Sequence, residues 1–239
     1  MKDIAQLTIP YAPRPLQQAL HMDPTRFKVL VCHRRFGKTV WAINQAISRA
    51  IYCYGNEMKS PRVAYIAPLL KQARTVAWDY AKEFLSAMPG YKPNEGNLHI
   101  DFLDNCRLNL YGSDNPDAAR GIYLDDVVLD EYAQMSPKMW SEIIRPALSD
   151  RRGTASFIGT PKGKNNFFEI YERAVKDESG QWAGYLYKAS DTQYVDQGEL
   201  DFAAGDMSEE EYAQEYECSW EAAIRGSYYG KTMEAITKK

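Results

Sequence analysis

A glycine, a lysine and a threonine follow one another directly after an apolar run. Gly37, Lys38 and Thr39 match the last three positions of the GxxxxGK[ST] pattern, whose first position is here Cys32 instead of glycine. In such a loop the backbone N–H groups approach phosphate oxygens, the lysine reaches the β- and γ-phosphates, and the hydroxyl binds Mg²⁺. An ordinary strand–helix turn can match three positions by chance. The strand-like run KVLVC before the loop and the helical spacing after it favour phosphate binding.

Four residues, His33 to Phe36, lie between Cys32 and Gly37 in this loop. Arg34 and Arg35 are unusual there, and either could bring positive charge to the γ-phosphate from the same subunit. A solvent-facing basic turn is the alternative. We predict that the nucleotide-binding residues of the loop include Arg34, Arg35, Phe36, Gly37, Lys38 and Thr39. Lys38 and Arg35 are also candidates for catalysis.

A second apolar run, VVLDE, ends in two adjacent carboxylates. We expect Asp130 to hold Mg²⁺, through water or through Thr39. Glu131, on the opposite side of the pleat, is expected to orient and deprotonate the attacking water. Two acids after a strand can also cap a helix, but the combination with Gly-Lys-Thr indicates a matched Walker A and Walker B pair. Because transfer to a metabolite needs no water-activating glutamate, ATP hydrolysis is favoured. The acids at 125–126 lie at the start of the strand, too far from the phosphates.

Strand-like runs that are rich in β-branched and apolar residues alternate with stretches of helical spacing. Strands are expected at 28–32, 62–67, 98–103, 106–111, 126–130 and 154–159, and helices at about 38–51, 69–87 and 136–148. This alternation predicts an α/β fold with a mostly parallel sheet and helices on both faces. The strands on either side of Asp104–Asn105 are expected to form a hairpin. Ser136–Pro137 indicates a helix start, and Ser208 with Glu211 indicates a capping box.

The composition is that of a soluble globular protein with one large domain. The 239 residues are 45% hydrophobic and 26% charged. No apolar run approaches the roughly 18–20 residues that span a bilayer, and the N-terminus lacks a secretory signal, so we expect a cytoplasmic protein without a membrane segment. Four scattered cysteines and three scattered histidines argue against a zinc site or a disulfide framework.

Charge is unevenly distributed along the chain. Residues 206–221 carry seven acids and no bases, which leaves 25 of the 32 acids against 29 bases elsewhere. A mildly basic body with an acidic C-terminal helix could meet DNA on one face. A solvated helix face explains the same acidic run.

Six segments, in order along nearly the whole chain, resemble the ATPase domain of the large terminase subunit, the motor that packages DNA into tailed-phage and related viral capsids. They are PRPLQ (13–17), CHRRFGKT (32–39), DNPDAARG (114–121), VVLDEYAQM (127–135), IGTPKGKNNF (158–167) and ECSWEAAIRGSYYG (217–230). That family tolerates arginines and a missing first glycine in the loop. The resemblance implies a P-loop NTPase of the ASCE/RecA-like class, with an ATPase core at 1–200. Residues 201–239 would form a small lid and the start of a linker to a nuclease domain that this sequence lacks, so we expect no nuclease activity.

The resemblance also implies roles for individual residues. Gln17 is similar to the glutamine that contacts adenine, although an exposed polar residue near a helix start is the alternative. Arg120 is similar to the arginine finger that acts on a neighbour's ATP, which can accelerate hydrolysis by about 10³–10⁵; a helix cap or surface ion pair is the alternative. Thr160 resembles the residue of the coupling motif that senses the γ-phosphate. Lys162 and Lys164 could touch the DNA backbone or simply form a polar turn.

As a whole, the resemblance implies a viral, bacteriophage-type packaging motor. Its cofactors would be ATP and Mg²⁺, and its partners double-stranded DNA, the portal protein and the small terminase subunit. It would work as a homo-oligomeric ring that can dissociate to monomers, in the host cytoplasm and transiently on the procapsid, but not in the mature virion or at a membrane. Two alternatives are a helicase-like nucleic-acid-dependent ATPase, which usually needs a second RecA-like domain, and a nucleotide-binding module without hydrolysis, which has no need of Glu131.

Overall fold

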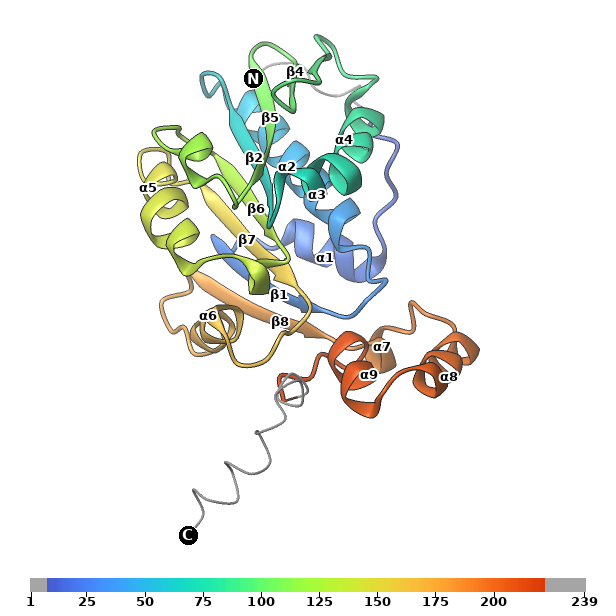
Figure 1. Cartoon of the computed structure of the whole chain (residues 1–239). Coiled ribbons are helices and arrows are strands. Elements are labelled where there is room, and N and C mark those ends of the chain that lie inside the picture. Colours follow the sequence, from blue (N-terminus) through green and yellow to red (C-terminus); the bar gives the residue numbers. More distant parts are fainter. Residues whose placement is uncertain (1–7, 222–239) are drawn as a thin grey trace.

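One eight-stranded sheet runs through residues 8–221, the part of the chain that the computed structural model describes. The strand order is β3-β4-β5-β2-β6-β7-β1-β8, with helices on both faces (Figure 1). The strands are β1 (Phe27–Cys32), β2 (Arg62–Ala67), β3 (Lys92–Asn94), β4 (His99–Phe102), β5 (Cys106–Gly112), β6 (Asp126–Asp130), β7 (Thr154–Gly159) and β8 (Trp182–Tyr187). The segment predicted to continue the lid and linker beyond residue 221 lies outside the described residues.

The strand pairings confirm the predicted mostly parallel sheet. β1 pairs in parallel with β7 and β8, β2 with β5 and β6, and β6 with β7. The antiparallel pairing of β4 with β5 confirms the predicted hairpin, and β3 extends it. The sequence pattern does not predict β3 or β8. β3 has only three residues, and β8 is a half-buried edge strand in which Gly184 lets a helix approach: a Cβ there would lie 2.8 Å from Val175 Cγ2.

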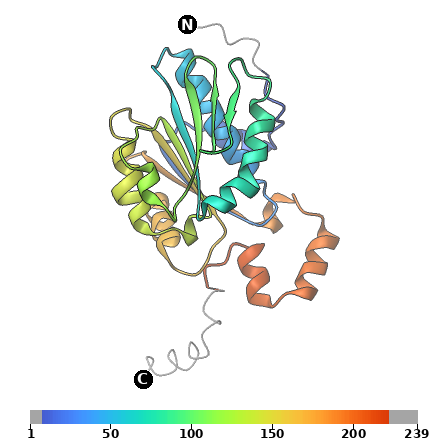
Figure 2. The same ribbon diagram turned by 45° about the horizontal axis from the view of Figure 1, so that its top comes forward.

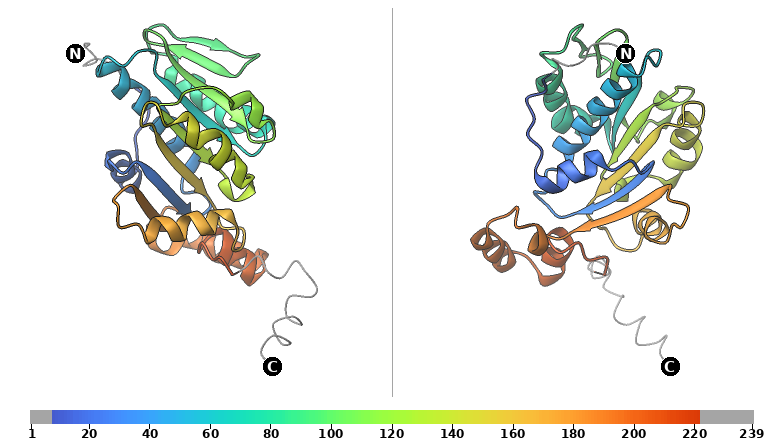
Figure 3. Two further views of the ribbon diagram at one scale, coloured as in Figure 1. Left: turned by 90° about the vertical axis from the view of Figure 1, so that its left-hand side faces the viewer. Right: turned by 180° about the vertical axis from the view of Figure 1, so that it is seen from behind.

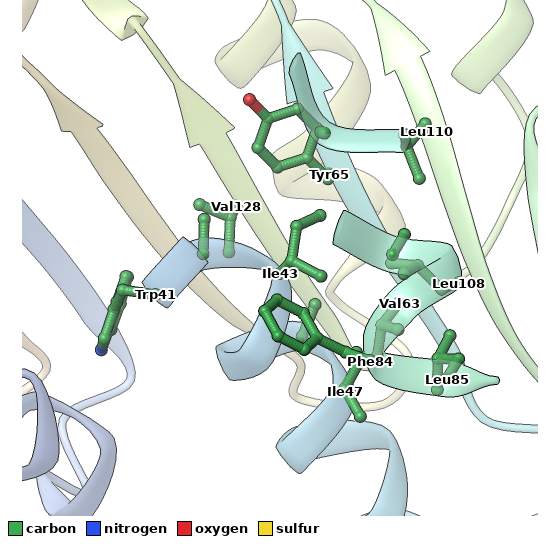
Figure 4. Packing of buried hydrophobic residues seen from close by; sticks show 14 of the residues in the cluster. Trp41, Ile43, Ile47, Val63, Tyr65, Phe84, Leu85, Leu108, Leu110 and Val128 are labelled. Carbon is green, nitrogen blue, oxygen red and sulfur yellow. The ribbon is translucent and has the colours of Figure 1, made fainter. Parts of the chain in front are cut away.

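Alternating side chains of the central strands pack into two separate apolar layers. Leu30 and Val128 belong to the layer beneath helix α2 (Lys38–Gly55), whereas Val31 and Leu129 belong to the layer beneath helix α6 (Asn166–Val175). The two views in Figure 3 show the helices on the two sides of the sheet. Figure 4 shows the first layer, where Ile43 of α2 lies among side chains of the sheet.

Helices cover both faces of the sheet, and two of them contain π-helical turns. The first face carries α1 (Pro15–Met22), α2, α3 (Leu70–Gln72) and α4 (Trp78–Leu85), and the second carries α5 (Arg145–Ala147) and α6. The helix predicted over 69–87 is interrupted by a π-helical turn, η1 (Ala73–Ala77). The predicted helix start at Ser136–Pro137 is confirmed, since Pro137 and Lys138 are helical and the Lys138 N–H donates to Ser136 Oγ at 3.4 Å. From Met139 this helix continues as the π-helical turn η4 (Met139–Ile144). In residues 8–221 no helix is both long enough and apolar enough to cross a membrane.

Three short helices form a small unit after β8, which we call the lid. They are α7 (Ala189–Thr192), α8 (Gln197–Asp206) and α9 (Glu209–Glu215), and Figure 2 shows them set apart from the helices that flank the sheet. The predicted capping box is confirmed, since the Glu211 N–H donates to Ser208 Oγ at 3.2 Å. Ala189, Leu200 and Tyr216 share an apolar cluster of their own. Because the boundary predicted after residue 200 falls inside α8, we propose that the lid starts at Ala189.

Candidate nucleotide-binding site

The loop at 33–37 joins the carboxyl end of β1 to the start of α2. Gly37 has φ +88°, in the left-handed region that suits glycine, and it directly precedes the helix. A Cβ at this position would lie 2.7 Å from Gln17 Nε2, so a side chain here would have to displace the Gln17 amide. The first backbone N–H groups of an 18-residue helix therefore face the loop, an arrangement that favours bound anions.

Lys38 folds back over this loop. Its Nζ donates to the carbonyl oxygens of Cys32, at 3.3 Å, and His33, at 3.2 Å. A triphosphate offers the same ammonium group anionic oxygens, which accept stronger hydrogen bonds than neutral carbonyls do. The lysine lies where a phosphate-binding loop needs it.

Gln17 lies under the loop instead of at an exposed position. The side chain is 4% exposed, and its Nε2 donates to the carbonyl oxygens of Phe36, at 3.1 Å, and Gly37, at 3.4 Å. Its Oε1 accepts from the Arg14 N–H at 3.0 Å. The amide thus connects the start of α1 to the loop, while a contact with adenine stays a prediction.

Thr39 and Asp130, the two predicted Mg²⁺ ligands, lie in direct contact. Thr39 Oγ1 donates to Asp130 Oδ2 at 3.3 Å, although 91 residues separate them in the chain. The strand order explains the contact: β6 lies two positions from β1, with β7 between them, and the side chain of Asp130 lies on the α2 face because Val128 does. Burial raises the pKa of the Asp130 carboxyl above its usual range.

Glu131 lies just beyond the end of β6. Its backbone is left-handed, with φ +52°, and its N–H donates to Asp130 Oδ1 at 2.9 Å. The direction of its side chain is therefore set by this turn and not, as the sequence suggests, by alternation along the strand. Burial raises the pKa of the Glu131 carboxyl, the Asp130 charge raises it further, and the charges of Lys38 and Lys162 oppose the rise.

Thr160 directly follows β7, the strand between the two motif-bearing strands. It is 5% exposed, and the preceding Gly159 is close to the acid pair: a Cβ on Gly159 would lie 3.4 Å from Glu131 Cα. The predicted sensor is thus next to both the phosphate loop and the acid pair.

The comparison with known families agrees with this geometry. The family model described as "Terminase large subunit, T4likevirus-type, N-terminal" matches residues 34–235. The chain belongs to the large terminase subunit family. It is 41% identical over 211 residues to the large terminase subunit of Thermus virus P23-45, covering 80% of this chain and 41% of that protein. With that of Escherichia phage T5 it shares 23% identity over 203 residues, 83% of this chain and 45% of the relative. The terminase chain therefore spans less than half of these relatives.

Solved structures support the same fold. The large terminase ATPase domain of Thermus phage P74-26 has a TM-score of 0.74 at 23% identity, over 89% of this terminase chain and 95% of that domain. The large terminase of another thermophilic bacteriophage, in complex with ADP, gives a TM-score of 0.69 at 15% identity, over 86% and 52% of the two chains. The predicted P-loop type of α/β fold is confirmed.

Two residues of the phosphate loop also contact the terminase lid. His33 is fully buried, and its Nε2 forms a 2.8 Å hydrogen bond with Thr192 Oγ1. The Arg34 N–H donates to the carbonyl oxygen of Glu215 at 2.7 Å, and its Nη1 lies 3.5 Å from Glu215 Oε2. Arg34 is thus directed towards the lid and not towards the rest of the loop, where Arg35 is exposed with φ +70°.

Arg120 lies on the surface, in the segment that connects β5 to β6. Its side chain is 60% exposed and its Nε lies 2.9 Å from Asp117 Oδ1. In the described residues its side chain contacts Asp117 and none of the loop residues 33–39, so the structure of one terminase subunit does not bring the arginine to the phosphate loop.

The two lysines that follow Thr160 differ in their surroundings. Both are exposed, but Lys164 Nζ forms an ion pair with Glu221 Oε1 at 2.5 Å. Burial and the Asp130 charge raise the pKa of Glu131, and the positive charge of Lys162 is among the influences that lower it.

Besides Thr192, sequence reasoning missed three residues that contact the site. Arg14 donates to the carbonyl oxygen of Arg35 at 3.3 Å and stacks on the Tyr194 ring, with its Cζ 4.6 Å from the centroid. Tyr65 donates to Asp130, and Glu215 binds the loop from the lid. Only Arg14 has a local signal, since it belongs to the same PRPLQ segment as Gln17.

Proposed function

We propose that this domain hydrolyses MgATP and that the protein uses the energy to drive double-stranded viral DNA into a procapsid. The observation that carries the proposal is the contact between Thr39 and Asp130, which joins the lysine-bearing loop to the acid pair. The alternatives predicted from sequence, a helicase-like ATPase and a pure binding module, gain no separate support from the site.

The residues present fit a Mg²⁺ ion that is shared with a triphosphate. One hydroxyl and one carboxylate already meet, and Mg²⁺ is usually held by one or two carboxylates plus substrate phosphates. No group of three or more His, Cys, Asp or Glu side chains gathers within residues 8–221, and such a site needs none. Thr39 and Asp130 would hold the ion, which neutralises charge on the phosphates. Lys38 would bind the β- and γ-phosphates from the loop side.

Glu131 is the proposed general base. It follows the metal-binding carboxylate directly, and its buried surroundings raise its pKa, which makes it a better proton acceptor than an exposed carboxylate. Accepting a proton from water leaves a hydroxide-like nucleophile for the γ-phosphorus. Thr160, buried beside the acid pair, is the proposed sensor of the γ-phosphate, and Gln17, which holds the loop, is the proposed neighbour of adenine.

Arg120 is the proposed finger that one subunit offers to the next. It is exposed on the segment between β5 and β6 and contacts Asp117 rather than the loop of its own subunit, so a neighbouring subunit is the natural recipient. Arg35, exposed in the loop, is proposed to bring positive charge to the γ-phosphate of the nucleotide in its own subunit. A head-to-tail contact of this kind generates a closed ring when its rotation closes.

The wider assembly is proposed from family membership. The partners are double-stranded DNA, the portal protein, the small terminase subunit and further copies of this chain in a homo-oligomeric ring. The complex would act in the host cytoplasm and on the procapsid, and be absent from the mature virion. The large terminase structures of a thermophilic bacteriophage with ADP and with ATP-gamma-S support ATP as the nucleotide used here. The Mg²⁺ ion is proposed from the contact between Thr39 and Asp130.

Phosphate release by a Glu131→Gln variant tests the proposal. We expect nucleotide affinity within about threefold of the unchanged protein and a turnover lowered by about 10²–10⁴. Glu169→Gln, which changes an exposed acid in the first turn of α6, serves as the control and should leave turnover unchanged. Full turnover in Glu131→Gln would remove the general base from the proposal.

A further inference from the structure

A tyrosine outside all the recognised motifs binds the carboxylate of Asp130. The Tyr65 hydroxyl donates to Asp130 Oδ2, and the tyrosine is 1% exposed. Thr39 Oγ1 donates to the same oxygen at 3.3 Å, while the Glu131 N–H donates to Oδ1 at 2.9 Å. Both oxygens of the carboxylate are therefore fixed by hydrogen bonds.

The sheet explains why this tyrosine reaches Asp130. β2 lies next to β6, and Tyr65 is in register with Val128, two residues before Asp130. All three side chains lie on the α2 side, because Tyr65 and Val128 belong to the same apolar layer. A tyrosine ring is long enough to reach the diagonal neighbour on the adjacent strand. Figure 4 shows the ring beside the apolar side chains, with its hydroxyl pointing away from them.

The two hydroxyl donors on Asp130 Oδ2 differ in their proposed roles. Thr39 would also be a ligand of the Mg²⁺ ion through its oxygen, whereas Tyr65 would take no part in binding the metal. The place of the Tyr65 hydroxyl is set by the sheet and not by the nucleotide. A buried carboxylate oxygen that loses a hydrogen-bond donor costs free energy and is held less firmly.

We propose that Tyr65 is a positioning residue, which holds the Asp130 carboxylate in the orientation that binds the Mg²⁺ of the nucleotide complex. This inference rests on the proposed function. The proposed site then includes a hydrogen-bond donor on β2 in addition to the loop and the acid pair. Binding of Mg²⁺ would therefore depend on the register between β2 and β6.

The test is Mg²⁺-dependent binding of a fluorescent ADP analogue by the full 239-residue chain with Tyr65→Phe. The substitution keeps the ring and removes only the hydroxyl. We expect the Mg²⁺ concentration for half-maximal binding to rise about tenfold, the effect of losing one hydrogen bond to a charged group. Affinity in EDTA should stay within about twofold, since no metal is then bound.

Tyr132→Phe is the matched control. Tyr132 is also buried and directly follows Glu131, but no contact joins it to Asp130 in the described residues. Removal of the Tyr132 hydroxyl should leave the Mg²⁺ concentration for half-maximal binding unchanged. Equal effects of the two variants, or a Tyr65→Phe variant with the Mg²⁺ dependence of the unchanged protein, would overturn the role of Tyr65.

A double-variant cycle separates positioning from damage to the fold. In an Asp130→Asn background the carboxylate is gone, so Tyr65→Phe should not change the Mg²⁺ requirement further. Additive effects would contradict the inference. If the unchanged chain itself bound ADP without any dependence on Mg²⁺, the proposed function would fail, which is a different outcome from failure of Tyr65 alone.

Discussion

Arg34 of the phosphate loop and Glu215 of the lid bind each other twice. The Arg34 N–H donates to the Glu215 carbonyl oxygen at 2.7 Å, and the two charged groups lie 3.5 Å apart. The loop and helix α9 are therefore linked by main chain as well as by side chain. A change in the position of the lid would move the loop that we propose binds the phosphates.

We predict that Arg34→Ala and Glu215→Ala have the same effect, because each removes the same ion pair. The side chains are 63% and 21% exposed, so each loss should alter the free energy of unfolding by less than about 1 kcal/mol. Their effects on the KM for ATP should be equal, and the double variant should add nothing. Steady-state kinetics with Glu142→Ala, another exposed partner of an ion pair, gives the control. A loss of kcat confined to Arg34→Ala would instead assign Arg34 to the γ-phosphate.

Gly37→Ala should destabilise the protein by about 1–3 kcal/mol in chemical denaturation. The backbone is left-handed, at φ +88°, and the added Cβ would lie 2.7 Å from Gln17 Nε2. In a Gln17→Ala background the cost of the close contact with Gln17 should disappear, and the cost of the left-handed backbone should remain. Gly205→Ala is the control, because its Cβ meets nothing within 4 Å inside helix α8, and it should be neutral or stabilising. Equal costs of Gly37→Ala in both backgrounds would contradict the Gln17 contact.

The site was predictable where its chemistry is local in sequence. Gly37, Lys38, Asp130 and the strands that carry them follow from short motifs and apolar runs, and the structure brings Thr39 to Asp130 as expected. The rest depends on packing between distant segments. Tyr65 meets Asp130 only through the register of β2 with β6.

Three other features could not be predicted from the sequence, for related reasons. Arg34 is directed to a helix that starts 175 residues later in the chain, at Glu209. Glu131 leaves its strand through a left-handed turn that no residue type signals. The π-helical turns η1 and η4 change which side chains face the core, although the helical spacing around them is regular.

The buried carboxyl of Asp126 should make the free energy of unfolding depend on pH. This effect is independent of catalysis. Asp126 is fully buried and its Oδ2 lacks a hydrogen-bond partner among the described residues. Burial raises its pKa from 3.8 to about 6, although the Thr154 hydroxyl and the charges of Arg49 and Lys28 oppose the rise. A raised pKa in the folded state favours folding below about pH 4, and this contribution is lost as the pH rises through 6.

Asp126→Asn removes that titration. Relative to the unchanged protein, the variant should gain up to about 3 kcal/mol in free energy of unfolding between pH 4 and pH 8, at about 1.4 kcal/mol per pKa unit. Urea unfolding at both pH values measures the gain. A difference between the two proteins that stays constant with pH would show that the carboxyl does not titrate in this range.

Arg120→Ala should lower ATP turnover by about 10³ in the assembled ring, because we propose that this arginine acts on a neighbour's nucleotide. Mixing it with Glu131→Gln subunits should restore part of the activity, since an Arg120→Ala site with its base intact then receives the arginine of a Glu131→Gln neighbour. Each variant measured alone is the reference. Mixtures no more active than the average of the two would place the arginine's action within its own subunit or outside catalysis.

The most direct test of the account is a crystal structure of the domain with Mg²⁺ and a non-hydrolysable ATP analogue. We predict that the triphosphate lies over the loop at 33–37 with Lys38 on its β- and γ-phosphates, and that the Mg²⁺ ion binds Thr39 Oγ1 beside the Asp130 carboxylate. A nucleotide bound elsewhere, or an ion far from Asp130, would contradict the claim that the loop and the acid pair form one site.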